Sequence, residues 1–79
     1  RPRLYPNPTN QATTLMFDNS ENENCTLRLC NTQGQLVRTI TDITTEKVEI
    51  ERENLTSGLY FFQLRTERQV IATGKLIIE

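Results

Sequence analysis

Cysteine, serine and carboxylate side chains are the groups in this sequence that could carry chemistry, and their inventory argues against an enzyme. The chain contains no histidine and two cysteines, Cys25 and Cys30. It therefore cannot form a Ser/His/Asp or Cys/His arrangement from its own residues. Two cysteines without histidine also cannot complete a tetrahedral zinc site. Its serines, Ser20 and Ser57, fall in stretches that we predict to be turns. We expect no enzymatic activity and no cofactor.

The polar segment 18–23 is faintly similar to a calcium-binding loop, because side-chain oxygens recur there at alternate positions. Such a loop needs a glycine at its sixth position and a bidentate glutamate at its twelfth. Glu23 and Leu29 occupy these positions here. We interpret the segment as a solvated loop and expect no metal site.

The two cysteines are not expected to bond to each other. Residues five apart in one strand are separated by about 16 Å and point to opposite faces, whereas a disulfide needs Cα atoms within about 7 Å. We interpret Cys25 and Cys30 as small, partly buried apolar residues. Pairing with another chain or a metal role stays open, so cysteine usage does not fix the redox compartment.

Length and charge limit the remaining possibilities. Seventy-nine residues correspond to one domain, and a chain of this size buries only about 60% of its unfolded surface. A net charge of −1 argues against nucleic acid as a partner, since that would require a basic face. No apolar run is long enough to span a membrane. Residues 1–3 look like the end of a linker, and residues 4–79 like a single domain belonging to a longer polypeptide.

Alternation of apolar and polar residues predicts short β-strands along most of the chain. No stretch repeats apolar residues at the three- and four-residue spacing of a helix. Six or seven short strands at intervals of about 8–12 residues predict an all-β fold, a small antiparallel sandwich. After an extended entry at 4–8, strands are expected at 12–18, 25–31, 35–42, 46–51, 57–66 and 69–79.

The same alternation indicates which residues face inward. The most apolar stretch is the final hairpin, where Tyr60, Phe62 and Leu64 share one face. Adjacent Leu36 and Val37 leave the inward residue of their strand undecided. Other inward positions are Cys25, Leu27, Leu29, Val48 and Ile50, with Leu55 as an apolar plug in a turn. A solvated outer face is expected for Glu49, Glu51, Arg52 and Glu53.

Four short motifs carry a resemblance to a known family. They lie at residues 4–9 (LYPNPT), 31–37 (NTQGQLV), 55–61 (LTSGLYF) and 74–78 (GKLII). In this order and spacing the chain resembles, over residues 4–79, the type A C-terminal sorting domain of the type IX secretion system of Bacteroidetes. The two cysteines lie outside the motifs.

The resemblance implies an immunoglobulin-like β-sandwich attached to the C-terminus of a secreted cargo protein. It implies transit through the periplasm and an outer-membrane translocon, with the secretion machinery as partner. A sortase-like enzyme would then remove the domain, leaving the cargo anchored at the cell surface or released. The cargo itself could be an enzyme, such as a protease.

The resemblance also assigns roles to particular residues. The mainly structural motif positions are Pro6, Asn7, Pro8, Gly34, Gly58 and Tyr60. The export signal would lie on Lys75, Leu76, Ile77, Ile78 and Glu79.

Lys75 interrupts an apolar run, where packing alone gives no reason for a charge. We expect it to serve either recognition or the prevention of aggregation at an edge strand. The final strand, 70–79, is expected at a sheet edge, where a transport component would add a strand by main-chain pairing. A homodimer through the same edge is possible.

Two alternative functions remain from the sequence. One is an immunoglobulin-like binding or adhesion module, which would need an exposed aromatic platform, with Tyr5 and Phe61 as the candidates. The other is a structural accessory module that stabilises or dimerises its cargo. The last strand should discriminate between these readings: an unpaired edge would favour recognition or dimer formation, whereas a fully covered edge would weaken both.

Overall fold

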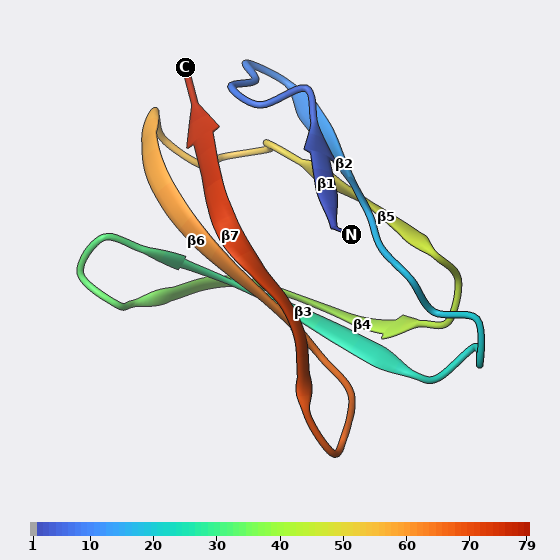
Figure 1. Ribbon diagram of the computed structural model, residues 1–79. Helices are drawn as coiled ribbons and strands as arrows, with labels where there is room; N and C mark the ends of the chain where they lie inside the picture. Colours follow the sequence, from blue (N-terminus) through green and yellow to red (C-terminus); the bar gives the residue numbers. More distant parts are fainter. Residues whose placement is uncertain (1) are drawn as a thin grey trace.

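The computed structural model describes residues 2–79 and shows a two-layer β-sandwich (Figure 1). No helix of membrane-spanning length and hydrophobicity occurs among these residues. The strands are β1 (Arg3–Tyr5), β2 (Ala12–Met16), β3 (Cys25–Asn31), β4 (Leu36–Ile43), β5 (Lys47–Glu51), β6 (Gly58–Arg65) and β7 (Val70–Ile78).

The strands form a three-stranded sheet of order β1-β2-β5 and a four-stranded sheet of order β4-β3-β6-β7. All strand pairs within the sheets are antiparallel. The chain changes sheet between β2 and β3, between β4 and β5, and between β5 and β6, so β2 pairs with β5 and β3 with β6. This connectivity is that of an immunoglobulin-like sandwich, and the predicted fold class is confirmed.

The core lies between the two sheets, and the alternation predicted it correctly. All the positions expected to face inward are buried, including Leu55 in its turn. The largest fully buried side chains come from both sheets and are Leu15, Leu27, Leu29, Ile50, Leu64 and Leu76. A core built from alternate residues leaves the opposite face of every strand free to carry charge.

Some predicted strand ends differ from the structure. β1 begins at Arg3, which pairs with Met16, so Arg3 is part of the sheet and not of a linker; Arg1 lies outside the described residues. Leu36 and Val37 are both exposed. The register of β3 and β4 shifts between Leu29 and Cys30, and the end of this hairpin projects beyond the sandwich (Figure 1).

Two arginines tie the sheets together at the end of β5, and the prediction of a solvated Arg52 is wrong. Arg38, on β4, donates to the carbonyl oxygens of Glu51 and Arg52 and lies 3.7 Å from the Glu53 carboxylate. The half-buried Arg52 side chain instead turns toward Glu79 and the two turns that precede β2 and β6. Its acceptors are the carbonyl oxygens of Asn10, Leu55 and Glu79 and the hydroxyl of Ser57.

Asn19 gives the acidic loop an internal order that the sequence did not predict. Its buried side-chain amide donates to the carbonyl oxygens of Glu23 and Thr45 at 3.0 and 3.1 Å. Its side-chain oxygen accepts from the Glu23 N–H at 3.0 Å. Asn19 is therefore the buried anchor of the loop, and exposed Asn22 adds a side-chain hydrogen bond to the Thr44 carbonyl oxygen.

Thr13 offers a test of the core. Its hydroxyl is buried and has no hydrogen-bond partner among residues 2–79, and an unsatisfied buried polar group is destabilising. We expect Thr13→Val to raise the free energy of unfolding by about 1 kcal/mol. Urea denaturation followed by circular dichroism measures this, with Thr14→Val as the neighbouring, less buried control. A lower urea midpoint for Thr13→Val would contradict the expectation.

Candidate functional site

The final strand, β7, lies at the edge of the four-stranded sheet, where the sequence placed it. Its residues alternate between core and surface: Leu76 and Ile78 are buried, whereas Lys75 and Ile77 are exposed. The five residues predicted to form a signal therefore divide into core residues and residues that a partner can reach. Packing does explain the charge of Lys75, because this position faces solvent.

Asn7 covers the outer edge of β7 with its side chain. Its amide nitrogen donates to the Lys75 carbonyl oxygen, and its side-chain oxygen accepts from the Ile77 N–H, both at 2.9 Å. Thr9 continues the pairing with backbone groups, donating to the Ile77 carbonyl at 3.0 Å and accepting from the Glu79 N–H at 2.8 Å. Together these bonds resemble a very short parallel strand.

The flanking prolines explain why a side chain takes part in this pairing. Pro6 and Pro8 have no N–H to donate, so the backbone on either side of Asn7 cannot form a regular ladder. Both prolines are exposed at the margin of the domain, where they fix the path of the chain beside β7.

This cover corrects the expectation that a partner pairs with the main chain along the whole of β7. The Lys75 carbonyl and the outward backbone groups of Ile77 are already bonded to Asn7 and Thr9. At residues 70–73, β7 pairs with β6 on its inner edge, and no segment of the described chain pairs with its outer edge. Near Lys75, side chains are therefore what this edge offers to a partner.

The other motif residues have structural roles. Gly34 has φ +81° in the turn between β3 and β4, a conformation that favours glycine, and Gly58 has φ +151° at the start of β6. The Tyr60 hydroxyl donates to the Thr56 carbonyl oxygen at 2.7 Å. This is the tyrosine corner of immunoglobulin-like folds, and it fixes the crossing from β5 to β6.

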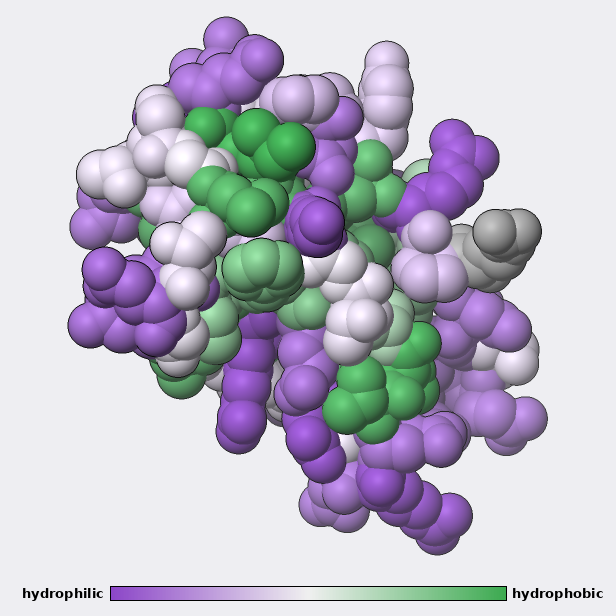
Figure 2. Space-filling view, turned by 60° about the vertical axis from the view of Figure 1, so that its left-hand side comes forward, coloured by the Kyte–Doolittle hydropathy of each residue, from purple (hydrophilic) through white to green (hydrophobic). Residues whose placement is uncertain are grey.

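The outward side of β3, β6 and β7 forms a shallow hollow of about 540 Å³. Cys30, Phe61 and Lys75 lie directly opposite one another on the three strands, and Arg28, Gln63 and Thr73 form the adjacent row. Phe61 is 41% exposed. Phe62 and Gly74 complete its lining, and we call this surface the Phe61 hollow. In Figure 2, which brings the left-hand side of Figure 1 forward, apolar residues lie grouped at the surface among hydrophilic ones.

Comparison with known proteins agrees with this arrangement of motifs. A family model described as a secretion system C-terminal sorting domain matches residues 3–79. The chain belongs to this family. No curated protein matches it. Membership identifies a type IX secretion sorting signal, which acts with the secretion machinery and an N-terminal cargo in a protein destined for the cell surface or the exterior.

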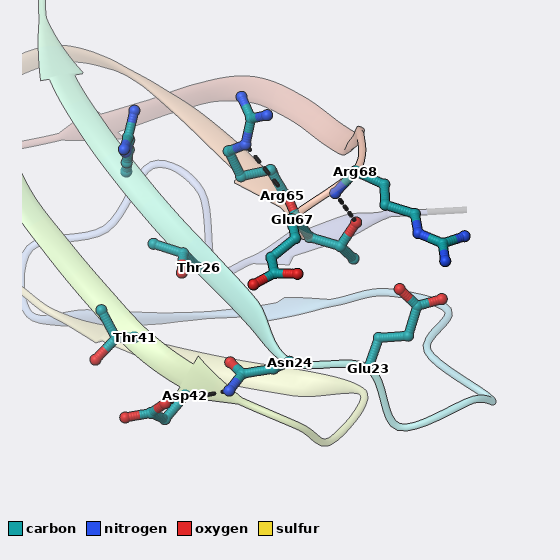
Figure 3. Close-up of a pocket in the computed structure, with 10 residues that line it drawn as sticks. Glu23, Asn24, Thr26, Thr41, Asp42, Arg65, Glu67 and Arg68 are labelled. Carbon is teal, nitrogen blue, oxygen red and sulfur yellow. Dashed lines mark hydrogen bonds between the residues drawn. The ribbon is translucent and has the colours of Figure 1, made fainter.

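A second hollow of the sorting domain, about 590 Å³, lies between the turn after β6 and the facing ends of β3 and β4 (Figure 3). Its charges balance: the lining includes Glu23, Asp42, Glu67, Arg28, Arg65 and Arg68. Asn24 donates to the Asp42 carboxylate at 3.2 Å. Among the described residues, no three His, Cys, Asp or Glu side chains gather in a way that could hold a metal ion.

The two aromatic residues of the binding-module alternative do not form one platform in the sorting domain. Tyr5 is 74% exposed but belongs to β1 in the three-stranded sheet, whereas Phe61 belongs to β6 in the other sheet. A carbohydrate platform made of both is therefore excluded.

The cysteines of the sorting domain occupy different environments and are not bonded to each other. Cys25 is buried in the core, and burial, together with the nearby negative charge of Glu23, raises the pKa of its thiol. Cys30 is half-buried in the Phe61 hollow. A reagent that alkylates thiols should reach Cys30 first, because the Cys25 thiol is both covered and harder to ionise.

Proposed function

We propose that this domain directs its cargo through the type IX outer-membrane translocon, and that the secretion machinery recognises the outward side chains of the β7 region. The observation that supports this reading is the division of β7. Leu76 and Ile78 are used in the core, which leaves Lys75, Ile77 and the following Glu79 as the exposed part of the predicted signal.

The later steps of the proposal rest on family membership. The domain folds in the periplasm, with its last strand held at the sheet edge by Asn7 and Thr9. A translocon or shuttle component then binds the exposed face. A sortase-like enzyme removes the domain after transport, and the cargo is anchored at the surface or released.

A fused reporter tests the proposal in a host with a working type IX system. The full chain is placed behind a periplasmic reporter protein, and surface exposure is measured by protease accessibility. We expect the parent fusion to reach the surface and Lys75→Ala to lose most of this export. The control is Lys47→Ala, which removes the other lysine of the chain from the opposite sheet.

Each outcome of this experiment has a separate meaning. A parent fusion that stays inside the cell contradicts the sorting function. A Lys75→Ala fusion exported as well as the Lys47→Ala control contradicts the assignment of recognition to Lys75. Melting curves of the purified variants should coincide, since both lysines are exposed. Point variants are preferable to deletion of residues 75–79, which would also remove buried Leu76 and Ile78.

A further inference from the structure

The Phe61 hollow has an apolar floor on a face that packing does not require to be apolar. Phe61 lies beside half-buried Cys30, and Ile77, also 41% exposed, follows two positions after Lys75 on the same side of β7. Half-buried Leu59 stands opposite Ile77 in the strand pairing. These residues form a contiguous apolar stripe on the outward side of the sheet. Exposed patches of this kind mark interaction sites when polar residues border them.

Cations border this floor on both sides. Arg28 comes from β3 and Lys75 from β7, with the row of Phe61 and Gln63 on β6 between the two strands. Neither Arg28 nor Lys75 forms an ion pair with any of residues 2–79. No side-chain hydrogen bond occupies their charged groups within that part of the chain.

The charged residues in the lining of the Phe61 hollow are both cations. They are Arg28 and Lys75, although the chain as a whole carries a net charge of −1. Arg28 also borders the second hollow, where Glu23, Asp42 and Glu67 lie. The outward charges of the other sheet are mixed, since Arg3, Lys47, Glu49 and Glu51 are all exposed, and the negative charge of Glu49 raises the pKa of the Glu51 carboxyl. No acidic residue of the described chain lines the Phe61 hollow, so an acidic partner is favoured there.

We propose that the Phe61 hollow binds an acidic polypeptide segment of the secretion machinery. An apolar side chain of this segment sits against Phe61 and Cys30, and its carboxylates pair with Arg28 and Lys75. This assignment of the partner rests on the proposed sorting function. The concave floor favours a polypeptide segment over a lipid surface, since a flat bilayer would meet the charged rim but not the floor.

A peptide-binding experiment on the 79-residue chain tests the proposal directly. The probes are two fluorescently labelled synthetic peptides, one alternating aspartate with leucine and the other alternating lysine with leucine. We expect only the acidic peptide to bind, as measured by fluorescence anisotropy. Its affinity should fall as sodium chloride is raised above about 0.1 M, where charges are screened beyond roughly 10 Å.

Charge-reversal variants locate the binding site. We expect Arg28→Glu and Lys75→Glu each to weaken binding of the acidic peptide by about tenfold or more, because an attraction becomes a repulsion. Lys75→Arg should retain binding, and Lys47→Glu, on the other sheet, should not change it. The natural thiol provides an independent readout: the acidic peptide should slow alkylation of Cys30, which lies in the hollow.

Four results would overturn the assignment. They are equal binding of both peptides, undiminished binding to Arg28→Glu, unprotected Cys30 in the complex, and binding to phosphatidylglycerol vesicles without binding to the acidic peptide. Reporter export separates this inference from the proposed function. A parent fusion that is not exported contradicts the sorting function alone, whereas undiminished export of Arg28→Glu contradicts the role of the hollow while sorting stands.

Discussion

Replacing Arg52 by alanine is expected to lower the free energy of unfolding by about 2–3 kcal/mol. One guanidinium group serves four acceptors in three separate segments. It donates to the Leu55 and Asn10 carbonyl oxygens at 3.0 and 3.2 Å, to the Glu79 carbonyl oxygen at 2.7 Å and to the Ser57 hydroxyl at 3.2 Å. The variant loses these bonds together, and partial solvent access limits the penalty.

The comparison with other arginine variants makes this prediction specific. Arg52→Lys should recover only part of the loss, because an ammonium group lacks the planar fork that reaches several acceptors at once. Arg68→Ala is the matched control, because Arg68 is exposed in the turn after β6. This variant should have the same urea midpoint as the parent. Circular dichroism measures all three. An Arg52→Ala midpoint equal to that of Arg68→Ala would show that the hydrogen bonds of Arg52 do not stabilise the domain.

Gly74→Ala is expected to destabilise the domain by about 2 kcal/mol, the usual cost of overpacking. A Cβ atom at this position would lie 2.6 Å from Cε2 and 2.8 Å from Cζ of Phe62, the residue directly opposite Gly74 on β6. Phe62 is buried, so its ring cannot move without repacking the core. Elsewhere in a strand, the same substitution would normally be favourable.

A double-mutant cycle isolates this contact. Phe62→Leu alone should also destabilise the core, but Gly74→Ala should cost less in that background, because the ring is gone. Thr73→Ala, at the exposed neighbouring position, is the control for general effects on β7. Strictly additive losses, or a Gly74→Ala variant as stable as the parent, would argue that the backbone absorbs the added methyl group.

The alternation of single residues was enough to predict the architecture. Tyr60, Phe62 and Leu64 could be assigned to the core because a strand places every second residue on one face. The same reasoning, applied along β7, also accounts for Lys75, which shares the outward side with Ile77. The order and spacing of the four motifs indicated the family. Periodicity alone does not distinguish this family from other small β-sandwiches.

The contacts that close the domain were beyond sequence reasoning. Arg52 stood between Glu51 and Glu53 and was assigned to a solvated face, yet two of its acceptors lie 27 and 42 positions away. Asn7 finds its partners 68 and 70 positions away. Polar side chains have no periodicity that points to such acceptors. The Phe61 hollow was likewise only partly visible, since Phe61 could be flagged for exposure but not paired with Arg28.

The cover over the edge of β7 has a consequence for the timing of folding. Asn7 and Thr9 are synthesised early, because translation proceeds from the N-terminus. Their partners Lys75, Ile77 and Glu79 are synthesised about 70 residues later. Closing a loop of this length is entropically unfavourable. A cargo chain interrupted before residue 75 would leave Asn7 and Thr9 without these partners. This closure therefore cannot form until residues 75–79 have been made.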